Sequence, residues 1–187
     1  SKKINAAYGM DTGGKGGNIE QTNKEIERLM GFRPDKYVIV NFDGIAAIVD
    51  AIGGVDYDVP FDMKYDDPSQ NLHIDLKKGQ QHLDGKQTVG FLRWRHNNDY
   101  TVQYTNGDEG RVENQQKFLK ALAGQVLQIK NVTKIRSIAE AVFKNVKTDF
   151  SAGELLWMGM QAMQIDNSSI QFFTLPGYGK MSTAGTS

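Results

Sequence analysis

The sequence predicts an α/β fold, a three-layer sandwich in which a mixed central β-sheet is flanked by helices. Segments with helical periodicity interleave along the chain with short segments rich in β-branched and aromatic residues, which is the pattern of sheets covered by helices. The 187 residues are 39% apolar and 10% aromatic, which suffices for one core of ordinary size. We therefore expect residues 1–187 to form a single domain.

The first elements expected are a helix, a strand and a second helix. Asn18 can cap a helix over residues 18–30, and Gly31 is suited to end it. Residues 36–42, KYVIVNF, are rich in β-branched and aromatic side chains, as a buried strand should be. Asp43 is expected to cap the short apolar helix that follows, which a pair of glycines closes.

Two alternating segments in the middle of the chain predict strands with one buried face. Residues 55–61 alternate apolar and polar side chains, although Pro60 places this strand near an edge or an end. Residues 72–76, LHIDL, repeat the alternation. A short helix is expected after the turn at Asp84, and it leads the chain to Arg93.

The last third predicts three helices and a strand. One helix covers residues 108–129, and an amphipathic one covers 133–144. Ser151 and Glu154 have the spacing of a capping box at the start of the third helix. Residues 169–175, SIQFFTL, are typical of a strand. The third helix carries large apolar side chains that we expect mostly in the core: Trp157, Met158, Met160 and Met163.

Composition excludes several classes of protein. The formal net charge is zero and the isoelectric point is near 6.8, whereas a general nucleic-acid binder has a broad basic excess. The chain contains no cysteine, so disulfides and thiolate chemistry are excluded. No apolar run is long enough to cross a bilayer and no signal peptide is present, so the protein is either cytosolic or lacks its anchor in this chain.

The segment over residues 88–116 predicts an anion-binding site. It contains three arginines, Arg93, Arg95 and Arg111, in a chain without net charge. A guanidinium group is a planar fork of donors that binds phosphate in a bidentate manner and stays charged at physiological pH. The helix expected to begin near Asp108 adds free N–H groups, which also favour an anion. A phosphate-like ligand is therefore predicted.

The spacing of these residues predicts how they converge. In an extended segment Arg93 and Arg95 project to one side, while Leu92 and Trp94 project to the other side, into a core. Arg111 follows on a helix and can face the same pocket. The alternative is that the arginines pair with acids on a solvated surface. The acids in question are Asp99, Asp108 and Glu109.

Six segments, in order along nearly the whole chain, carry a family resemblance. They are KINAAY (3–8), DAIGGVDYDVP (50–60), LKKGQQHLDGKQ (76–87), FLRWRH (91–96), GDEGRVENQQKFLKAL (107–122) and TLPG (174–177). These segments resemble successive motifs of the LytR–CpsA–Psr proteins. Members of this family are membrane-anchored, extracytoplasmic enzymes, mainly of Gram-positive bacteria, and they transfer glycopolymers such as wall teichoic acid or capsular polysaccharide from undecaprenyl pyrophosphate to peptidoglycan.

The resemblance implies the ligands of the pyrophosphate. Arg93 and Arg95 match the R-x-R of the family, and Arg111 matches the arginine of its D-x-x-R. Gln115 is expected to line the same pocket through its amide, and Lys3 lies where the family has a lysine near the phosphates. Fixed positive charge at a pyrophosphate supplies most of the catalysis in such transfers.

Asp108 matches the aspartate of the same D-x-x-R motif. As a general base it would help to remove the proton from the attacking sugar hydroxyl. Alternatively, it orients an arginine. The sequence leaves both roles open.

The chain departs from the family pattern at two places. Asn114 stands where the family often has an arginine, so one expected cation is missing. Residues 96–106 form a long insertion that is either a mobile lid or an ordinary loop. The family also implies an apolar cleft for the prenyl chain, and the apolar faces over residues 112–129 and 155–163 are candidates to line it.

The resemblance also implies structural features and a metal ion whose residues we expect upstream of this chain. The family begins with strands, a membrane anchor and aspartates linked to Mg²⁺, all expected upstream, so residues 1–187 are interpreted as a catalytic domain truncated at its N-terminus. We predict no metal site in this chain, since Asp62, Asp66 and Asp67 lie in a polar stretch typical of a turn.

The expected partners are an undecaprenyl-pyrophosphate-linked glycan, a peptidoglycan acceptor and, through a single-pass anchor, the extracytoplasmic face of the bacterial membrane. No nucleic acid is expected. Two alternatives are a module that binds the lipid-linked glycan without transferring it and a transcriptional regulator. The sequence has no helix-turn-helix signal for the latter.

Overall fold

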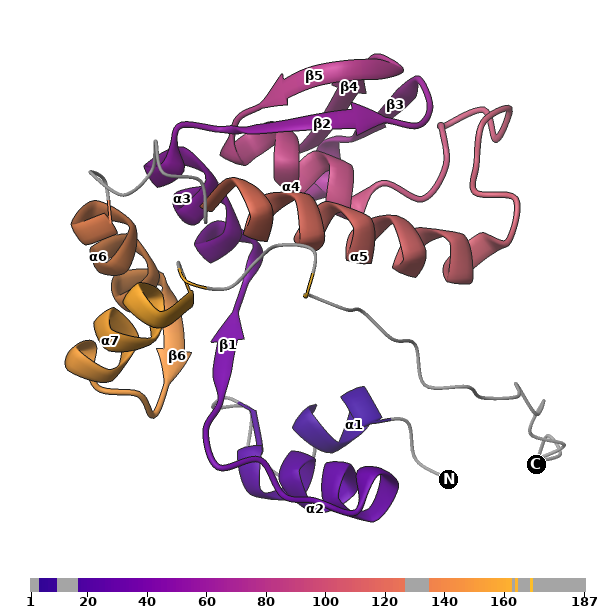
Figure 1. Cartoon of the computed structure of the whole chain (residues 1–187). Coiled ribbons are helices and arrows are strands. Elements are labelled where there is room, and N and C mark those ends of the chain that lie inside the picture. Colours follow the sequence, from indigo (N-terminus) through magenta and orange to yellow (C-terminus); the bar gives the residue numbers. More distant parts are fainter. Residues whose placement is uncertain (1–3, 10–16, 127–134, 163, 165–168, 170–187) are drawn as a thin grey trace, which may run out of the picture.

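The computed structural model describes residues 4–9, 17–126, 135–162, 164 and 169. Helices and short strands alternate along them (Figure 1), which confirms the predicted α/β class. In chain order the elements are α1 (Ile4–Gly9), α2 (Ile19–Met30), β1 (Val38–Val40), α3 (Phe42–Ile52), β2 (Val55–Val59), β3 (Met63–Asp67), the short 3-10 helix η1 (Pro68–Gln70), β4 (Leu72–Leu76), β5 (Gly79–Leu83), α4 (Gly85–Arg93), α5 (Gly107–Val126), α6 (Ile135–Asn145), β6 (Val146–Thr148) and α7 (Ala152–Ala162).

The described strands pair as three two-stranded antiparallel sheets: β1 with β6, β2 with β5, and β3 with β4. They do not form the single mixed sheet that the sequence predicts. The reason lies in the connections, because a parallel pair needs a crossover of about a dozen residues or more, whereas β2 to β5 follow one another through short links. These four strands form one long hairpin, the β-ribbon, which lies over α4 and α5 (Figure 1).

The β-ribbon bends where its two sheets meet. Residues 60–62 join β2 to β3, and only residues 77–78 join β4 to β5 on the opposite side. One side therefore has an extra residue, as in a β-bulge, which bends the ribbon. Asp62 stabilises the bend, since its carboxylate accepts a hydrogen bond from the Lys78 backbone N–H at 2.8 Å.

The main core lies between the β-ribbon and the helices beneath it. Val55, Val59, Met63 and Leu83 point inward from the strands and are fully buried. Aromatic rings from both layers meet beneath them, and the ring centroids of Phe91 and Phe118 lie 5.3 Å apart. Each such side chain contributes about 1.5–3 kcal/mol on burial. The remaining members of the core are Val49, Ile52, Leu72, Ile74, Leu76, Leu92, Trp94, Tyr104 and Ile138.

Most predicted helix ends are confirmed. The side chain of Asn18 accepts from the Gln21 N–H, and Gly31 ends α2 in the left-handed conformation. The capping box at Ser151 and Glu154 forms with both hydrogen bonds. Asp43, however, is not the cap of α3. Asn41 holds that position because its side-chain oxygen accepts from the Gly44 N–H at 2.8 Å, and Asp43 lies in the first turn.

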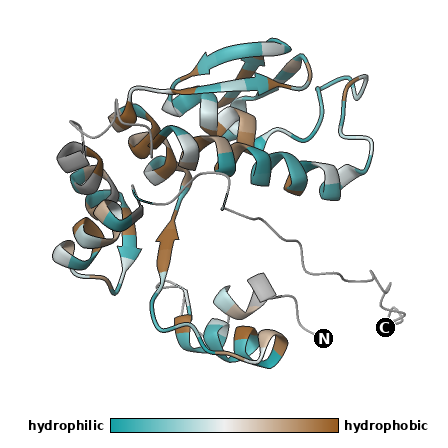
Figure 2. Ribbon diagram, viewed as in Figure 1, coloured by the Kyte–Doolittle hydropathy of each residue, from teal (hydrophilic) through white to brown (hydrophobic). Residues whose placement is uncertain are grey.

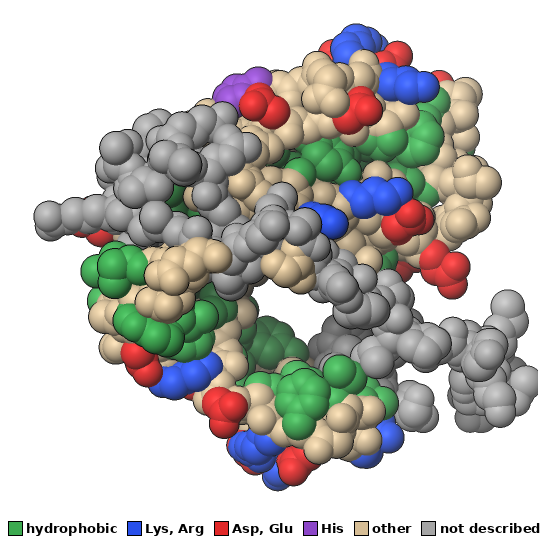
Figure 3. All heavy atoms as spheres, in the orientation of Figure 1, with side chains coloured by type: hydrophobic (Ala, Val, Ile, Leu, Met, Phe, Trp, Pro, Cys, Tyr) green, Lys and Arg blue, Asp and Glu red, His purple; other side chains and the backbone are tan. Residues whose placement is uncertain are grey.

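Two predictions of burial are wrong. In β1, Val38 is 50% exposed, because this strand pairs only with β6 among the described strands. In α7, Trp157 is 59% exposed, and Met158 and Met160 are exposed as well, because the helix packs mainly against α6. The hydropathy colouring marks β1 as hydrophobic (Figure 2), and apolar side chains gather on the surface over α6 and α7 and over α2 (Figure 3).

Some predicted segments lie outside the described residues. They include the end of the helix predicted over 108–129 and the strand predicted over 169–175. Of the described helices, none combines the length and the apolar character needed to cross a membrane.

Candidate functional site

Helix α4 positions the first two arginines. It begins with a capping box in which Asp84 and Gln87 satisfy each other's backbone N–H groups. It ends at Arg93, so this part of the chain is not the extended segment that the sequence predicts. Trp94 follows in an extended conformation and is only 1% exposed. This buried ring anchors the chain between Arg93 and Arg95.

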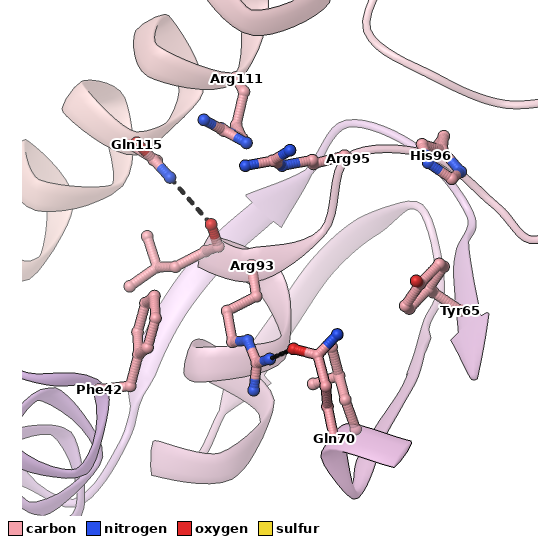
Figure 4. A pocket seen from close by; sticks show the side chains of 10 residues that line it. Phe42, Tyr65, Gln70, Arg93, Arg95, His96, Arg111 and Gln115 are labelled. Atoms are coloured by element: carbon pink, nitrogen blue, oxygen red, sulfur yellow. Dashed lines mark hydrogen bonds between the residues drawn. The ribbon is translucent and has the colours of Figure 1, made fainter. Parts of the chain in front are cut away.

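A cavity of about 500 Å³ opens between the end of α4, the start of α5 and the β-ribbon. Four of the residues predicted to bind the pyrophosphate line this cavity (Figure 4). Arg93 is the last residue of α4, Arg95 follows that helix, and Arg111 and Gln115 belong to α5. The lining residues are Phe42, Tyr65, Gln70, Leu72, Leu92, Arg93, Arg95, His96, Arg111 and Gln115.

Two of the three arginines in the cavity have no acidic partner among the described residues. Of the described residues that line the cavity, none is an aspartate or a glutamate. Arg93 donates to the side-chain oxygen of Gln70 at 2.6 Å and lies over the ring of Phe42, 5.6 Å from its centroid. Arg95 forms no ion pair within the described part of the chain. Pairing with surface acids, the alternative left open by the sequence, therefore does not describe Arg93 and Arg95.

Arg111 is held more firmly than the other two arginines. Its side chain is only 17% exposed, and its terminal nitrogen lies 2.6 Å from the carboxylate of Asp108, one turn earlier on α5. Its Nε is buried and has no hydrogen-bond partner among the described residues. A buried donor without a partner is costly, so the described residues leave one polar atom of Arg111 unsatisfied.

Asp108 itself does not line the cavity. Its side chain is 74% exposed, and its contact is with Arg111. Asp108 also lies in the first turn of α5, where a negative charge is favoured by the helix dipole. The geometry is that of a residue that orients Arg111, one of the two roles that the sequence leaves open.

Gln115 joins the two helices that carry the arginines. Its amide nitrogen donates to the backbone oxygen of Leu92 at 2.8 Å. Carbonyls in the last turn of a helix lack partners within the helix, so this bond satisfies one of them and fixes α5 against the end of α4. Gln115 therefore has a positioning contact that its place in the motif does not reveal.

The insertion after Arg95 is a folded loop and not a free lid. Asn97 accepts from the Lys64 N–H at 2.7 Å and from the Trp94 ring nitrogen at 3.1 Å. Asn98 accepts from the Asp66 N–H and donates to the Asp66 carbonyl. The two amides thus occupy the open edge of β3, which would otherwise have unpaired backbone groups.

Tyr104 packs into the core and so fixes the other end of this loop. Its ring packs 5.1 Å from Trp94 and 5.6 Å from Phe61, measured between ring centroids. Burial raises the pKa of Tyr104 to about 12. The loop is therefore part of the core at one end and of the cavity wall at the other.

Sequence reasoning missed several residues of the site. Gln70 comes from η1 and carries no signal in the sequence. His96 could have been found, since it directly follows Arg95. The apolar part of the wall also differs from the prediction, because Phe42, Leu72 and Leu92 supply it. Phe118 of α5, by contrast, is fully buried in the ordinary core.

The described residues do not test two expectations. Lys3 lies outside the described residues. The described residues contain no group of three or more histidine, aspartate or glutamate side chains arranged to hold a metal ion, so Mg²⁺ stays a prediction from family resemblance, and no step below depends on it. Asp67 ends β3 and caps η1 through the N–H groups of Ser69 and Gln70.

The model of the LytR_cpsA_psr family matches residues 1–187. The chain belongs to the LytR–CpsA–Psr family. It is 36% identical over 174 residues to the polyisoprenyl-teichoic acid–peptidoglycan teichoic acid transferase TagV of Bacillus subtilis (strain 168), across 90% of this chain and 41% of TagV. It is 28% identical over 176 residues to the regulatory protein MsrR of Staphylococcus aureus (strain COL), across 93% of this chain and 48% of MsrR.

The fold is similar to that of solved LytR–CpsA–Psr structures. The crystal structure of B. subtilis TagV matches with a TM-score of 0.72 and 32% identity, and the match covers 95% of this chain and 63% of that chain. The predicted family and fold class are confirmed. The chain spans less than half the length of the two curated relatives.

Proposed function

We propose that this protein is a phosphotransferase that moves an anionic glycopolymer, of the wall teichoic acid or capsule type, from an undecaprenyl pyrophosphate carrier to peptidoglycan. The observation that carries the proposal is the meeting of Arg93, Arg95 and Arg111 in one cavity that is lined by no acidic residue from the described part of the chain. Family membership supports it, as does the similarity to TagV, whose name states a transfer of teichoic acid to peptidoglycan. The transfer would take place at the extracytoplasmic face of the membrane, to which a single-pass anchor would hold the whole protein.

The chemistry needs little more than charge and position. The acceptor hydroxyl oxygen forms a bond to the phosphorus that carries the glycan, the bridging P–O bond breaks, and prenyl phosphate leaves with the electron pair. The hydroxyl proton goes to a base or to solvent. Negative charge on the leaving phosphate grows during this step, and fixed arginines stabilise it more than they stabilise the bound substrate.

Each arginine has a distinct part in this proposal. Arg111, mostly buried and held by Asp108, would present a fixed guanidinium group at the cavity wall. Arg95 is exposed and unpaired within the described residues, so it can bind the phosphate without first breaking an ion pair. Arg93 would exchange or share its bond to Gln70.

The test is binding of a prenyl pyrophosphate to alanine variants of the three arginines. Each replacement should weaken binding by about 1.5–3 kcal/mol, the range for a hydrogen bond to a charged group, and lysine should restore only part of it. Arg33→Ala is the matched control, because Arg33 is exposed and pairs with Glu20 away from the cavity. Unchanged affinity in all three variants, with circular dichroism showing an intact fold, would contradict the proposal.

The apolar lining should bind part of the prenyl chain. Phe42, Leu72 and Leu92 lie in the cavity wall beside the arginines. Apolar burial contributes on the order of 25 cal/mol per Å² before the costs of association, so affinity should rise as the prenyl chain is lengthened at a constant headgroup. Equal affinity for short and long chains would exclude an apolar subsite.

A second candidate is a module that binds the lipid-linked glycan without transferring it. One observation favours it: among the described residues, the cavity wall contains no carboxylate that could take the hydroxyl proton. Transfer of a labelled lipid-linked glycan to peptidoglycan by the intact protein separates the two. Binding without turnover would support the module.

A further inference from the structure

The two sides of the arginine cavity differ in chemistry. Figure 4 shows Phe42 on one side of the arginines, and Tyr65 and His96 on the other side. Phe42 belongs to the apolar wall with Leu72 and Leu92. The opposite side consists of aromatic rings that also carry polar atoms, the hydroxyl of Tyr65 and the ring nitrogens of His96. His96 belongs to the folded loop after Arg95. A diphosphate ester held between the two sides would have its two substituents in different surroundings.

Three rings make up this second side, which we call the aromatic ledge: Tyr65, His96 and Tyr100. The ring of His96 packs edge-on against Tyr65, with centroids 5.7 Å apart. It stacks face to face on Tyr100, at 4.0 Å and 18°. Tyr65 and His96 line the cavity, while Tyr100 extends the ledge into solvent with 64% of its surface exposed.

Tyr100 is held at a backbone cost. Its φ is +59°, a conformation that is unfavourable for a bulky residue and that asparagine and glycine tolerate better. The loop maintains it, since the Tyr100 N–H donates to the Asn97 carbonyl at 3.0 Å and Asn97 is fixed to β3. An exposed ring in a strained position gains little stability from burial, and such strain is frequently found at ligand sites.

We propose that the aromatic ledge binds the first sugar ring of the glycan, the ring attached to the diphosphate, with Tyr100 as its stacking face. This inference rests on the proposed function. A pyranose ring has an apolar C–H face and a rim of hydroxyls, which matches side chains with an apolar body and a polar tip. The apolar wall suits the prenyl chain by the same reasoning. The ledge and the wall together orient the pyrophosphate in one direction, with the glycan toward His96 and the lipid toward Phe42.

Binding of paired ligands to the intact protein tests the assignment. The first ligand is a long-chain prenyl pyrophosphate, and the second is the same lipid with one hexopyranose on the diphosphate. The sugar should strengthen binding to the wild-type protein about threefold to tenfold, the range for one aromatic contact. Tyr100→Asn should abolish this gain and leave binding of the sugar-free lipid unchanged. Tyr100→Phe, which keeps the ring face, should retain it.

The choice of asparagine guards against misfolding. Asparagine adopts positive φ more readily than tyrosine, so the thermal midpoint of Tyr100→Asn should equal or exceed that of the wild-type protein. A third ligand, a soluble peptidoglycan fragment, distinguishes the donor sugar from the acceptor. Loss of its binding alone in Tyr100→Asn would overturn the assignment to the donor.

The other outcomes are equally decisive. A wild-type protein that binds both lipids equally overturns the ledge but leaves the arginine site intact. Equal weakening of both lipids by Tyr100→Asn also overturns it, since the loop would then act on the diphosphate. A wild-type protein that binds neither lipid overturns the proposed function and the ledge with it.

Discussion

The β-ribbon with η1, α3, α4, residues 94–106 and α5, which we call the ribbon body, differs from the peripheral elements α2, β1, β6 and α7. The ribbon body supplies nearly all the buried apolar side chains, with Ala7 and Ile138 as the exceptions. Helix α2 buries none of its residues, and exposed apolar side chains are frequent on β1 and α7. Both parts carry large apolar side chains, so an apolar face becomes core only where a second face lies opposite it.

The candidate site lies wholly on the ribbon body. Its arginines come from the end of α4 and the start of α5, and its apolar wall comes from α3, β4 and α4. A binding site needs side chains held by packing on rigid elements. The part of the molecule with the main core therefore positions the proposed pyrophosphate site.

Two tryptophans provide the strongest test of this comparison. Trp94→Ala should lower the free energy of unfolding by about 3–5 kcal/mol, because the ring is fully buried and packs against Phe61 and Tyr104. Trp157→Ala should change it by no more than about 0.5 kcal/mol, as for an exposed side chain. Urea denaturation followed by circular dichroism measures both. Losses of equal size would show that α7 is as well packed as the ribbon body.

Two glycines of α4 differ in how closely other residues of the ribbon body pack against them. A Cβ at Gly85 would lie 2.4 Å from the carbonyl oxygen of Ala46 in α3, whereas a Cβ at Gly90 would lie 3.4 Å from the nearest atom of Ile74. Gly85→Ala should therefore cost about 1–3 kcal/mol of stability. Gly90→Ala should be neutral or stabilise by up to about 1 kcal/mol through helix propensity.

Thermal unfolding of the two glycine variants decides the point. A stable Gly85→Ala protein would mean that α3 and α4 are further apart than the structure has them. The cavity wall would then be less rigid, since Phe42 and Leu92 belong to these two helices.

Substitutions of Asp108 test whether its exposed carboxylate affects lipid binding by orienting the mostly buried Arg111. If it orients Arg111, Asp108→Ala should lower lipid affinity and turnover together by about tenfold, at the low end for a hydrogen bond to a charged group because the pair is partly exposed. Asp108→Asn should lose less, since its amide oxygen can still accept from Arg111. The two variants should be compared in binding and in transfer assays on one preparation.

A general base would give a different pattern. Asn and Ala would then be equally inactive, with rates lower by about 10²-fold or more, and lipid affinity would be unchanged. That result would replace the orienting role with direct proton transfer.

The smallest effect is expected in the peripheral elements, at Glu154. The hydrogen bonds from Ser151, and then that from Lys36, lower the pKa of Glu154 from 4.5 to about 2. Because the folded pKa lies below the unfolded one, the contribution of the carboxylate to stability is complete above about pH 4.5 and is lost as the pH falls through about 2. Glu154→Gln keeps the capping geometry without the charge.

The thermal midpoints of the wild-type protein and Glu154→Gln should therefore differ by a small amount near neutral pH and converge toward pH 2. A gap that stays constant across this range would show that the charge of Glu154 contributes nothing to α7.

Several local features of the fold could be predicted from local signals, although the sequence predicts the cap of α3 at Asp43 and the structure has it at Asn41. Asn18, Gly31 and the pair Ser151 and Glu154 mark helix ends, because capping depends on residues three or four positions apart. The alternation in β2 and β4 follows from the period of a strand. Burial in β1 and α7 could not be predicted, since an apolar stretch does not specify its partner.

The amino-acid sequence was sufficient to predict the family, the helix ends at Asn18, Gly31 and Ser151, and the inward faces of β2 and β4. It was also sufficient to select Arg93, Arg95 and Arg111, which meet in one cavity. It did not reveal that Gln70 binds Arg93 or that Gln115 joins α5 to α4, because each of these bonds links residues that are close in space and 23 positions apart in the sequence. Side-chain alternation and helix spacing describe one element at a time, whereas a cavity is formed by the packing of several elements.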